Sequence, residues 1–220
     1  MKSESRAWGG FSSAGGPVAR PTQETAPVAY GDLADLAIPT DISALEQAVI
    51  TLAFLDVEAS SLRNGYPIEV GWAIVCEDRS ITTEGHLVRP EPAWLADEAR
   101  WSWESELVHR ISQVDLKHGL RCADIAARMN DVLGPLGTAY SDARRIDESW
   151  IDQIFAAAGV PRRFALHDVS RALEGADTDE VAYDRLERSF RSRPRPHRAA
   201  ADARQWAELW VATRRQKVRP

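Results

Sequence analysis

Cysteines and long apolar runs are scarce in this chain of 220 residues. It has only two cysteines, Cys76 and Cys122, and their spacing resembles neither a metal–thiolate site nor a disulfide framework. No apolar run approaches the roughly 20 residues that a membrane-spanning helix needs, and residues 1–16 lack the apolar core of a signal peptide. We therefore expect a cytoplasmic protein with no membrane partner.

The glycine and serine patterns of several enzyme classes are also missing. The chain has no P-loop and no dinucleotide-binding glycine pattern. Ser60 and Ser61 lie outside any nucleophile-elbow context, which argues against serine hydrolysis. Apolar residues make up 44% of the sequence and 8 residues are tryptophan. A chain of this length and composition is expected to fold around a substantial core.

Charge is distributed unevenly along the chain. The net charge is −6, but residues 184–220 contain 11 Lys/Arg and 4 Asp/Glu, which makes this segment +7 and the remainder −13. A basic arm beside an acidic body suits a polyanionic partner that is steered towards a cation-filled acidic pocket. On charge alone, a solvated basic tail is the simpler interpretation.

Composition divides the chain into three segments. Residues 1–48 begin with a stretch rich in Gly, Ser, Ala and Pro that has no sustained period, as is typical of a disordered or weakly structured leader. Periodic apolar segments occupy residues 49–213, which we expect to form one domain. Residues 214–220 form a short basic tail.

The most informative stretch lies at the start of this domain. The apolar run 50–55 is dense enough for a strand buried on both faces, and it leads directly to Asp56 and Glu58. Because alternate residues of a strand share a face, these two carboxylates project together. Such a pair makes a poor core and a good site for a hard cation. The alternative is a strand end that emerges into solvent.

The rest of the domain predicts an α/β protein. A turn at residues 64–65 and a strand over residues 68–74 complete a hairpin with the first strand. The later elements are a third strand (81–90), a loop with short helical turns (91–120), a helix (125–133), a strand (138–141), a helix from Asp147, a strand (163–166) and a final helix from about Arg198. The order βββαβαβα indicates a mixed sheet, with an antiparallel three-strand meander plus parallel strands, flanked by helices.

Two more acids and a histidine lie where helices begin. Asp147 starts a helix just after a short strand, and Asp202 lies in the first turn of the last helix, five residues after His197. With Asp56 and Glu58 they give four carboxylates from three separate elements, an inventory that suits two divalent cations. Mg²⁺ needs only a few carboxylates because it keeps several waters. His197, with an ordinary pKa of about 6.5, can take a proton from water at neutral pH.

Other polar and aromatic residues have simpler interpretations. Glu69 lies inside a strand, and we expect it to be a structural acid paired with a backbone or arginine group. Trp94, Trp101 and Trp103 could stack on nucleic-acid bases. Packing of the long loop that carries these three tryptophans is the preferred interpretation.

Three motifs, in the order of the family, make the chain similar to the DEDDh branch of the DEDD superfamily of 3′–5′ exonucleases. FLDVEASSL (54–62) resembles the first motif, AYSDARRIDESWI (139–151) the second and HRAAADARQWAEL (197–209) the third. ELVHRIS (106–112) resembles a short segment, usually Ile-His-Gly-Ile, between the first two motifs. The resemblance covers roughly residues 50–212 and implies a ribonuclease H-like fold.

This resemblance implies a role for each acid and for the histidine. Asp56 would touch both cations, Glu58 and Asp202 would bind the cation that activates water, and Asp147 would bind the other. His197 would be the general base.

The second motif departs from the family pattern. Many relatives carry His-Asn before the acid, where this chain has Ser141-Asp142. Two residues are therefore candidates for the third carboxylate. Asp147 fits the family position better, because it precedes the Trp150-Ile151 pair that packs the helix. Asp142 would then line the pocket or touch a bound water.

The resemblance also implies a substrate site and an activity. The backbone of Ala59 and the side chain of Leu62 would meet the terminal nucleotide, and His109 would line its pocket. The expected protein is a metal-dependent 3′–5′ exonuclease with two Mg²⁺ or Mn²⁺ ions, which releases nucleoside monophosphates from DNA or RNA 3′ ends, preferably single-stranded. The alternative is an inactive nucleic-acid-binding or adaptor module on the same fold. A homodimer is compatible with either.

Overall fold

The computed structural model describes residues 50–174, 181, 184, 188 and 197–214. The expected leader 1–48, most of the segment before His197, and the basic tail apart from Arg214 lie outside the described residues. Within the described residues, no helix is long and apolar enough to span a membrane.

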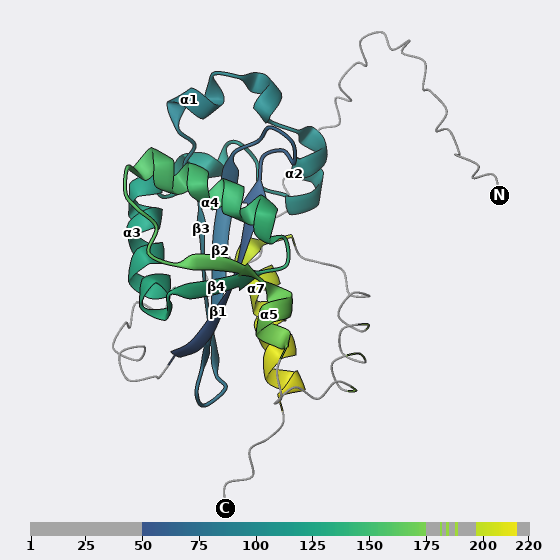
Figure 1. Ribbon diagram of the computed structural model, residues 1–220. Helices are drawn as coiled ribbons and strands as arrows, with labels where there is room; N and C mark the ends of the chain where they lie inside the picture. Colours follow the sequence, from purple (N-terminus) through teal and green to yellow (C-terminus); the bar gives the residue numbers. More distant parts are fainter. Residues whose placement is uncertain (1–49, 175–180, 182–183, 185–187, 189–196, 215–220) are drawn as a thin grey trace, which may run out of the picture. The chain divides into compact units, whose positions relative to one another are not determined.

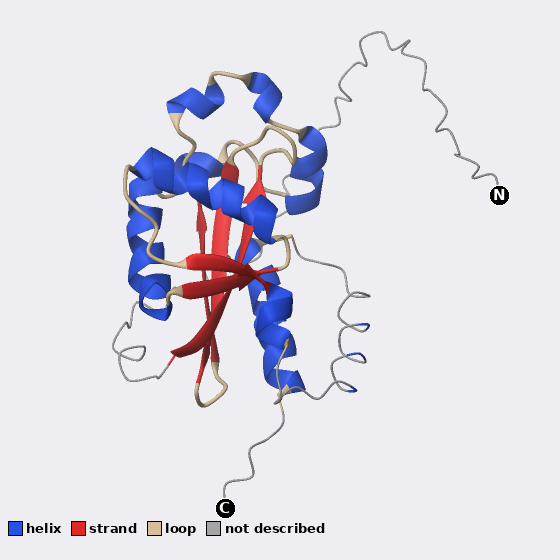
Figure 2. Cartoon of the chain, viewed as in Figure 1, coloured by secondary structure: helices blue, strands red, loops and turns tan. Residues whose placement is uncertain are grey.

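A five-stranded mixed sheet forms the centre of the domain (Figure 2). Its strands are β1 (Ile50–Ala59), β2 (Pro67–Cys76), β3 (Ile81–Leu87), β4 (Thr138–Ser141) and β5 (Ala165–Asp168). Their spatial order is β3-β2-β1-β4-β5. β1, β2 and β3 pair antiparallel, whereas β4 pairs parallel with β1 and with β5. The predicted mixed sheet, with its three-strand meander, is therefore confirmed.

Helices cover both faces of this sheet (Figure 1). The longer helices are α3 (Cys122–Leu133), α4 (Arg144–Ala158) and α7 (Ala199–Thr213), and the shorter ones are α1 (Pro92–Leu95), α2 (Trp103–His109) and α5 (Val169–Leu173). Short 3₁₀ turns are η3 (Glu98–Arg100), η4 (Asp115–His118) and η5 (Gly134–Leu136). As expected, the long segment between β3 and α3 contains only short helical turns.

Strand β1 separates two hydrophobic cores. Leu55 and its alternate neighbours pack in one core with residues of α3 and α4. Phe54, on the opposite face, packs with residues of α5 and α7, including Trp206. Asp56 and Glu58 continue the Phe54 face, because strand residues alternate. Both acids therefore belong to the side of the sheet along which α7 runs (Figure 1).

Several predicted boundaries differ from the structure. The acid pair lies at the end of β1 as predicted, because the pairing of β1 with β2 includes Asp56 and Glu58 and extends to Ala59. Helix α4 begins at Arg144, so Asp147 lies within its first turn. β5 is shifted two residues from the expected 163–166, and the five-residue helix α5 was not predicted.

The tryptophans of the long segment divide into two groups. Trp94 and Trp101 pack around the buried Tyr66, with ring centroids at 5.8 and 6.3 Å, which confirms a packing role. The packing interpretation is wrong for Trp103, whose surface is 65% exposed. Trp103 is the first residue of α2, where its side chain lies away from the core around Tyr66.

Candidate metal centre

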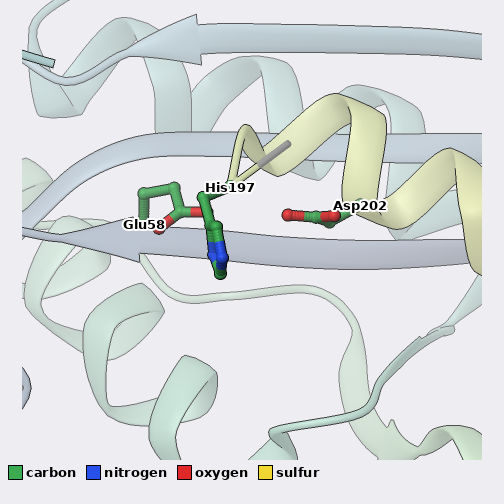
Figure 3. Close-up of side chains that lie close together, drawn as sticks. All are labelled: Glu58, His197 and Asp202. Carbon is green, nitrogen blue, oxygen red and sulfur yellow. The ribbon is translucent and has the colours of Figure 1, made fainter. Parts of the chain in front are cut away.

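The sequence-predicted acids come together in two groups on the α7 side of β1. In the first, ligand atoms of Glu58, His197 and Asp202 all lie within 4.8 Å of one another (Figure 3). In the second, oxygens of Asp56, Asp142 and Asp147 lie within the same distance of one another. We refer to them as the Glu58 group and the Asp56 group. Each could hold a metal ion, and oxygen-rich ligand sets of this kind suit Mg²⁺ or Mn²⁺.

The Glu58 group joins the end of β1 to the start of α7. Glu58 is on the strand, Asp202 is buried in the first turn of the helix, and His197 precedes the helix. His197 has a backbone φ of 49°, in the left-handed region that non-glycine residues seldom occupy. Such strained conformations persist where surrounding contacts enforce them. Figure 3 shows the His197 side chain lying between those of Glu58 and Asp202.

The start of α7 is fixed to β2 by a buried carboxylate. Glu69 accepts hydrogen bonds from the Arg198 guanidinium, with the shortest at 2.7 Å, and from the backbone N–H of Ala199 at 2.9 Å. The prediction that Glu69 is a structural acid paired with an arginine or the backbone is confirmed. Because Glu69 lies directly opposite Glu58 in the sheet, this pairing places His197 beside the strand acids.

Two glycines allow the helix to approach the sheet closely. Gly71 pairs with Asp56 on one side and with Gly85 on the other, so a row without side chains crosses β2 and β3. A Cβ atom on Gly71 would lie 2.2 Å from the backbone N of Ala200, and one on Gly85 would lie 2.8 Å from the Ala200 Cβ. The first turn of α7, with Asp202, therefore lies against β2 and β3, next to the strand that carries Asp56.

The Asp56 group is assembled where the parallel strands end. β4 ends at Ser141 and α4 begins three residues later, so Asp142 lies in the junction and Asp147 lies in the first turn of α4. The Ser141 hydroxyl donates a hydrogen bond to the Asp147 carboxylate and accepts one from the N–H of Ala143 at 3.1 Å. Both sequence candidates for the third carboxylate therefore lie next to Asp56.

Burial and mutual repulsion raise the pKa values of these carboxyls. The pKa of Asp56 is well above its ordinary value, first because of burial and then because of the negative charge of Asp147. Burial, followed by the charge of Asp202, raises the pKa of Glu58 to about 7. Burial also raises the pKa of Asp147 to about 7, although the Ser141 hydrogen bond acts in the opposite direction. Divalent cations would neutralise this concentrated charge, so the ligand set fits them.

The residues expected to contact a substrate differ in their exposure to solvent. Ala59 ends β1 directly after Glu58, and Leu62 follows in the next loop with 78% of its surface exposed. His109 is only 2% exposed, at the end of α2. Its Nδ1 accepts the N–H of Ile111 at 3.1 Å, so the proton of the neutral ring lies on Nε2.

His109 remains neutral over the ordinary pH range. Burial, together with the positive charges of Arg198 and His197, lowers its pKa to about 4. Its buried Nε2 has no hydrogen-bond partner among the described residues. A neutral donor near the Glu58 group can bind an uncharged or anionic acceptor without adding a charge of its own.

Sequence reasoning did not identify every residue that positions the site. It did not assign a role to Gly71, Gly85 or the Ser141 hydroxyl, and it did not consider Arg100, which contacts the loop containing Leu62. The adjacency of Ser141 to Asp142 at a strand end was a usable signal. The importance of the glycines depends on α7 lying across them, and no local pattern indicates that contact.

Comparison with known proteins identifies structural relatives only. No family model matches the chain, and no curated protein matches it in sequence. Among solved structures, the zinc-bound complex of E. coli exonuclease I with single-stranded DNA is similar with a TM-score of 0.55 and 17% identity. A ligand-free exonuclease I is similar with a TM-score of 0.54 and 18% identity, and a 3′-exonuclease that recognises the histone mRNA stem-loop with 0.56 and 13%.

These alignments cover most of this chain and a smaller part of the other proteins. They include 76%, 76% and 75% of this chain, respectively. They include 40% and 43% of the two exonuclease I chains and 63% of the histone mRNA 3′-exonuclease chain. The fold expected from the motifs is therefore confirmed: the chain has the ribonuclease H-like fold of these exonucleases.

Proposed function

We propose that the protein is a DEDDh-type 3′–5′ exonuclease that hydrolyses terminal phosphodiester bonds of nucleic acids with two Mg²⁺ or Mn²⁺ ions. The observation that carries this proposal is the pair of three-residue groups built around Asp56 and Glu58. Acids from β1, the β4–α4 junction and α7 converge there, together with a histidine. A buried carboxylate concentration of this kind is costly unless cations compensate it.

The residues of the two groups have complementary roles in this proposal. Asp202 and Glu58 would hold one cation, Asp147 would hold the other, and Asp56 would bind both. Asp142 is a further oxygen ligand, directly or through a water, in the Asp56 group. When bound, the two cations supply electrostatic stabilisation of the attacking and leaving oxygens.

His197 is the general base in this proposal. A ring nitrogen of His197 lies within 4.8 Å of carboxylate oxygens of Glu58 and Asp202 (Figure 3), so the imidazole can accept the proton of a water that attacks the terminal phosphorus. The bond from phosphorus to the 3′ oxygen of the preceding nucleotide breaks as the water oxygen bonds to phosphorus. The products are a nucleoside 5′-monophosphate and a shortened strand with a 3′-hydroxyl.

The proposed substrate is a single-stranded 3′ end of DNA or RNA. The structural relatives include an exonuclease crystallised with single-stranded DNA and a 3′-exonuclease that recognises an RNA stem-loop, so both sugars are candidates. The backbone of Ala59, the exposed Leu62 and the Nε2–H of His109 would contact the terminal nucleotide. The scarcity of cysteine favours action in the cytoplasm. The proposed activity is compatible with a homodimer.

Degradation of matched 5′-labelled DNA and RNA oligonucleotides, with Mg²⁺, Mn²⁺ or EDTA, tests this function. We expect metal-dependent shortening from the 3′ end, and a loss of roughly 10²–10⁴-fold in rate for His197→Ala. Asp56→Asn should be similarly impaired, whereas Glu208→Gln, in an exposed ion pair with Arg204, should retain the wild-type rate. Binding of the oligonucleotides without any shortening would instead support the inactive binding module.

A further inference from the structure

The loop that follows β1 is held closed by one arginine, Arg100. The Arg100 Nε donates to the carbonyl of Asn64 at 3.0 Å, and its Nη2 donates to the carbonyl of Gly65 at 2.5 Å. The Arg100 carbonyl accepts the hydroxyl of Ser60 at 2.7 Å. One residue therefore contacts the loop at its first position and at its last two positions.

Within this loop, residues 60–65, the chain folds tightly on itself. Ser60 is fully buried, and its hydroxyl also accepts the N–H of Tyr66 at 2.9 Å. The Ser60 carbonyl accepts the N–H of Ser102 at 2.9 Å, which joins the loop to the start of α2. A Cβ on Gly65 would lie 2.3 Å from the carbonyl oxygen of Ser61, so no side chain fits there. The backbone of the loop is thus fixed from several directions.

Arg100 also connects this loop to the helix of the Asp56 group. Its Nη2 donates to the side-chain oxygen of Gln153 at 3.0 Å. Gln153 lies on α4, six residues after Asp147. The guanidinium carbon lies 5.5 Å from the centre of the Tyr66 ring, which is buried against Trp94 and Trp101. A bidentate, planar donor group is suited to such simultaneous contacts, and a lysine is not.

Leu62 is a large apolar side chain on this restrained loop, and it does not pack into the protein. It lies four residues after Glu58, and 78% of its surface is exposed. Leu62 belongs to none of the three hydrophobic clusters, which lie on the two faces of the sheet and around Tyr66. The loop is rigid, and its exposed apolar side chain follows a candidate cation-binding carboxylate in the chain. Such a loop is suited to bind a substrate that has both a charged group and an apolar face.

We propose that Arg100 is a positioning residue for the substrate: it fixes loop 60–65 so that Leu62 is held at one place against the base of the 3′-terminal nucleotide. This inference rests on the proposed exonuclease function. Arg100 itself touches neither the cation ligands nor the reacting atoms. Its link to Gln153 keeps Leu62 in register with the helix that carries Asp147, so that the base contact and the scissile phosphate are aligned together.

A double-mutant cycle separates this role from a general contribution to stability. The variants are Arg100→Ala, Leu62→Ala and the double variant, with KM and kcat measured on a 5′-labelled single-stranded oligonucleotide. Losing a pre-organised apolar contact should raise KM roughly tenfold in each single variant, with kcat changed by about twofold or less. Because Arg100 acts through Leu62, the double variant should resemble the single variants and should not show their product.

Two further measurements test whether Arg100 acts by restraining loop 60–65. Amide hydrogen exchange of Ser60 and Tyr66, whose N–H groups are hydrogen-bonded across the loop, should accelerate in Arg100→Ala and remain unchanged in Leu62→Ala. Arg100→Lys should recover little of the KM loss, since a lysine cannot serve the three acceptors together. Arg121→Ala is the matched control: this arginine is exposed in a pair with Asp124 on α3, and its loss should leave KM and loop exchange unchanged.

The outcomes distinguish this inference from the proposed function. If the wild-type protein shortens no oligonucleotide, the proposed function is wrong and the substrate role of Arg100 falls with it. If the wild type is active but the Arg100 and Leu62 effects on KM multiply, the function stands and the positioning role is overturned. A KM of Arg100→Ala equal to that of the wild type, with faster loop exchange, would overturn it as well.

Discussion

Arg198 and Glu69 form an ion pair between residues 129 positions apart, with Nη2 and Oε1 separated by 2.7 Å. Glu69 lies on β2 directly opposite Glu58, and Arg198 follows His197. The pair therefore joins the strand that supports one ligand to the segment that carries another. The relative position of Glu58 and His197 therefore depends on the Arg198–Glu69 ion pair, although neither residue of this pair has a role in the proposed reaction.

Removing the Glu69 charge should weaken both stability and activity. In Glu69→Gln, the amide oxygen can still accept the N–H of Ala199, but the ion pair between residue 69 and Arg198 is lost. Since Glu69 is buried and Arg198 is partly exposed, we expect unfolding free energy to fall by about 2–3 kcal/mol, measured by urea denaturation. The rate kcat should fall as well, because His197 is less well placed. Glu208→Gln, in an exposed pair with Arg204, should change stability by about 0.5 kcal/mol or less.

Close contact between α7 and the sheet can be tested by steric rescue. Gly85→Ala places a methyl group 2.8 Å from the Ala200 Cβ, and we expect a destabilisation of about 1–3 kcal/mol. Ala200→Gly removes the obstructing atom and should restore much of the loss in the double variant. Gly71→Ala should resist this rescue, because its methyl group meets the backbone N of Ala200 at 2.2 Å. Thermal unfolding and kcat measure both effects, and equal rescue of the two variants would contradict the geometry.

Stability of the metal-free protein should decrease as pH rises. Folding raises the pKa of Glu58 from 4.5 to about 7 and that of Asp147 from 3.8 to about 7, so the folded state binds more protons than the unfolded state between these values. The stabilising contribution is complete below about pH 4 and is lost as pH rises through about 7. We expect the Tm in EDTA to fall between pH 5 and pH 7.5 in the wild type and to fall less in Glu58→Gln.

Cations should reverse this pH effect. Mg²⁺ or Mn²⁺ binds the ionised carboxylates, so it should raise Tm more at pH 7.5 than at pH 5. An equal shift of Tm at both pH values would indicate that the two groups are not the binding sites.

The two candidates for the third carboxylate can be compared directly. Both Asp142 and Asp147 lie beside Asp56, but Asp147 is buried and hydrogen-bonded by Ser141, whereas Asp142 is more accessible. We expect Asp147→Asn to lower kcat by about 10²-fold or more, and Asp142→Asn to weaken Mn²⁺ binding by about tenfold with a smaller loss of kcat. Calorimetric Mn²⁺ titration and steady-state rates measure the two effects. A larger loss of kcat in Asp142→Asn would reverse the assignment.

Local sequence patterns determined much of the architecture. The strand β4 was predicted with the observed bounds, and α3 ends where Gly134 and Pro135 predicted. The acids Asp56 and Glu58 were identified because an apolar strand led directly to two charges. Such features depend on neighbouring residues, so periodicity and turn chemistry are sufficient to find them.

Only the tertiary structure decided how the site is assembled. It brought oxygens of both Asp142 and Asp147 within 4.8 Å of one of Asp56, although their spacing alone left both as candidates. It also assigned Gly71, whose importance arises from a helix that begins 128 positions later in the chain. The sequence determined which groups could do the chemistry, because side-chain type and local periodicity are encoded residue by residue. Their distances were decided by the packing of α7 and α4 on the sheet, because contacts between remote segments leave no local pattern.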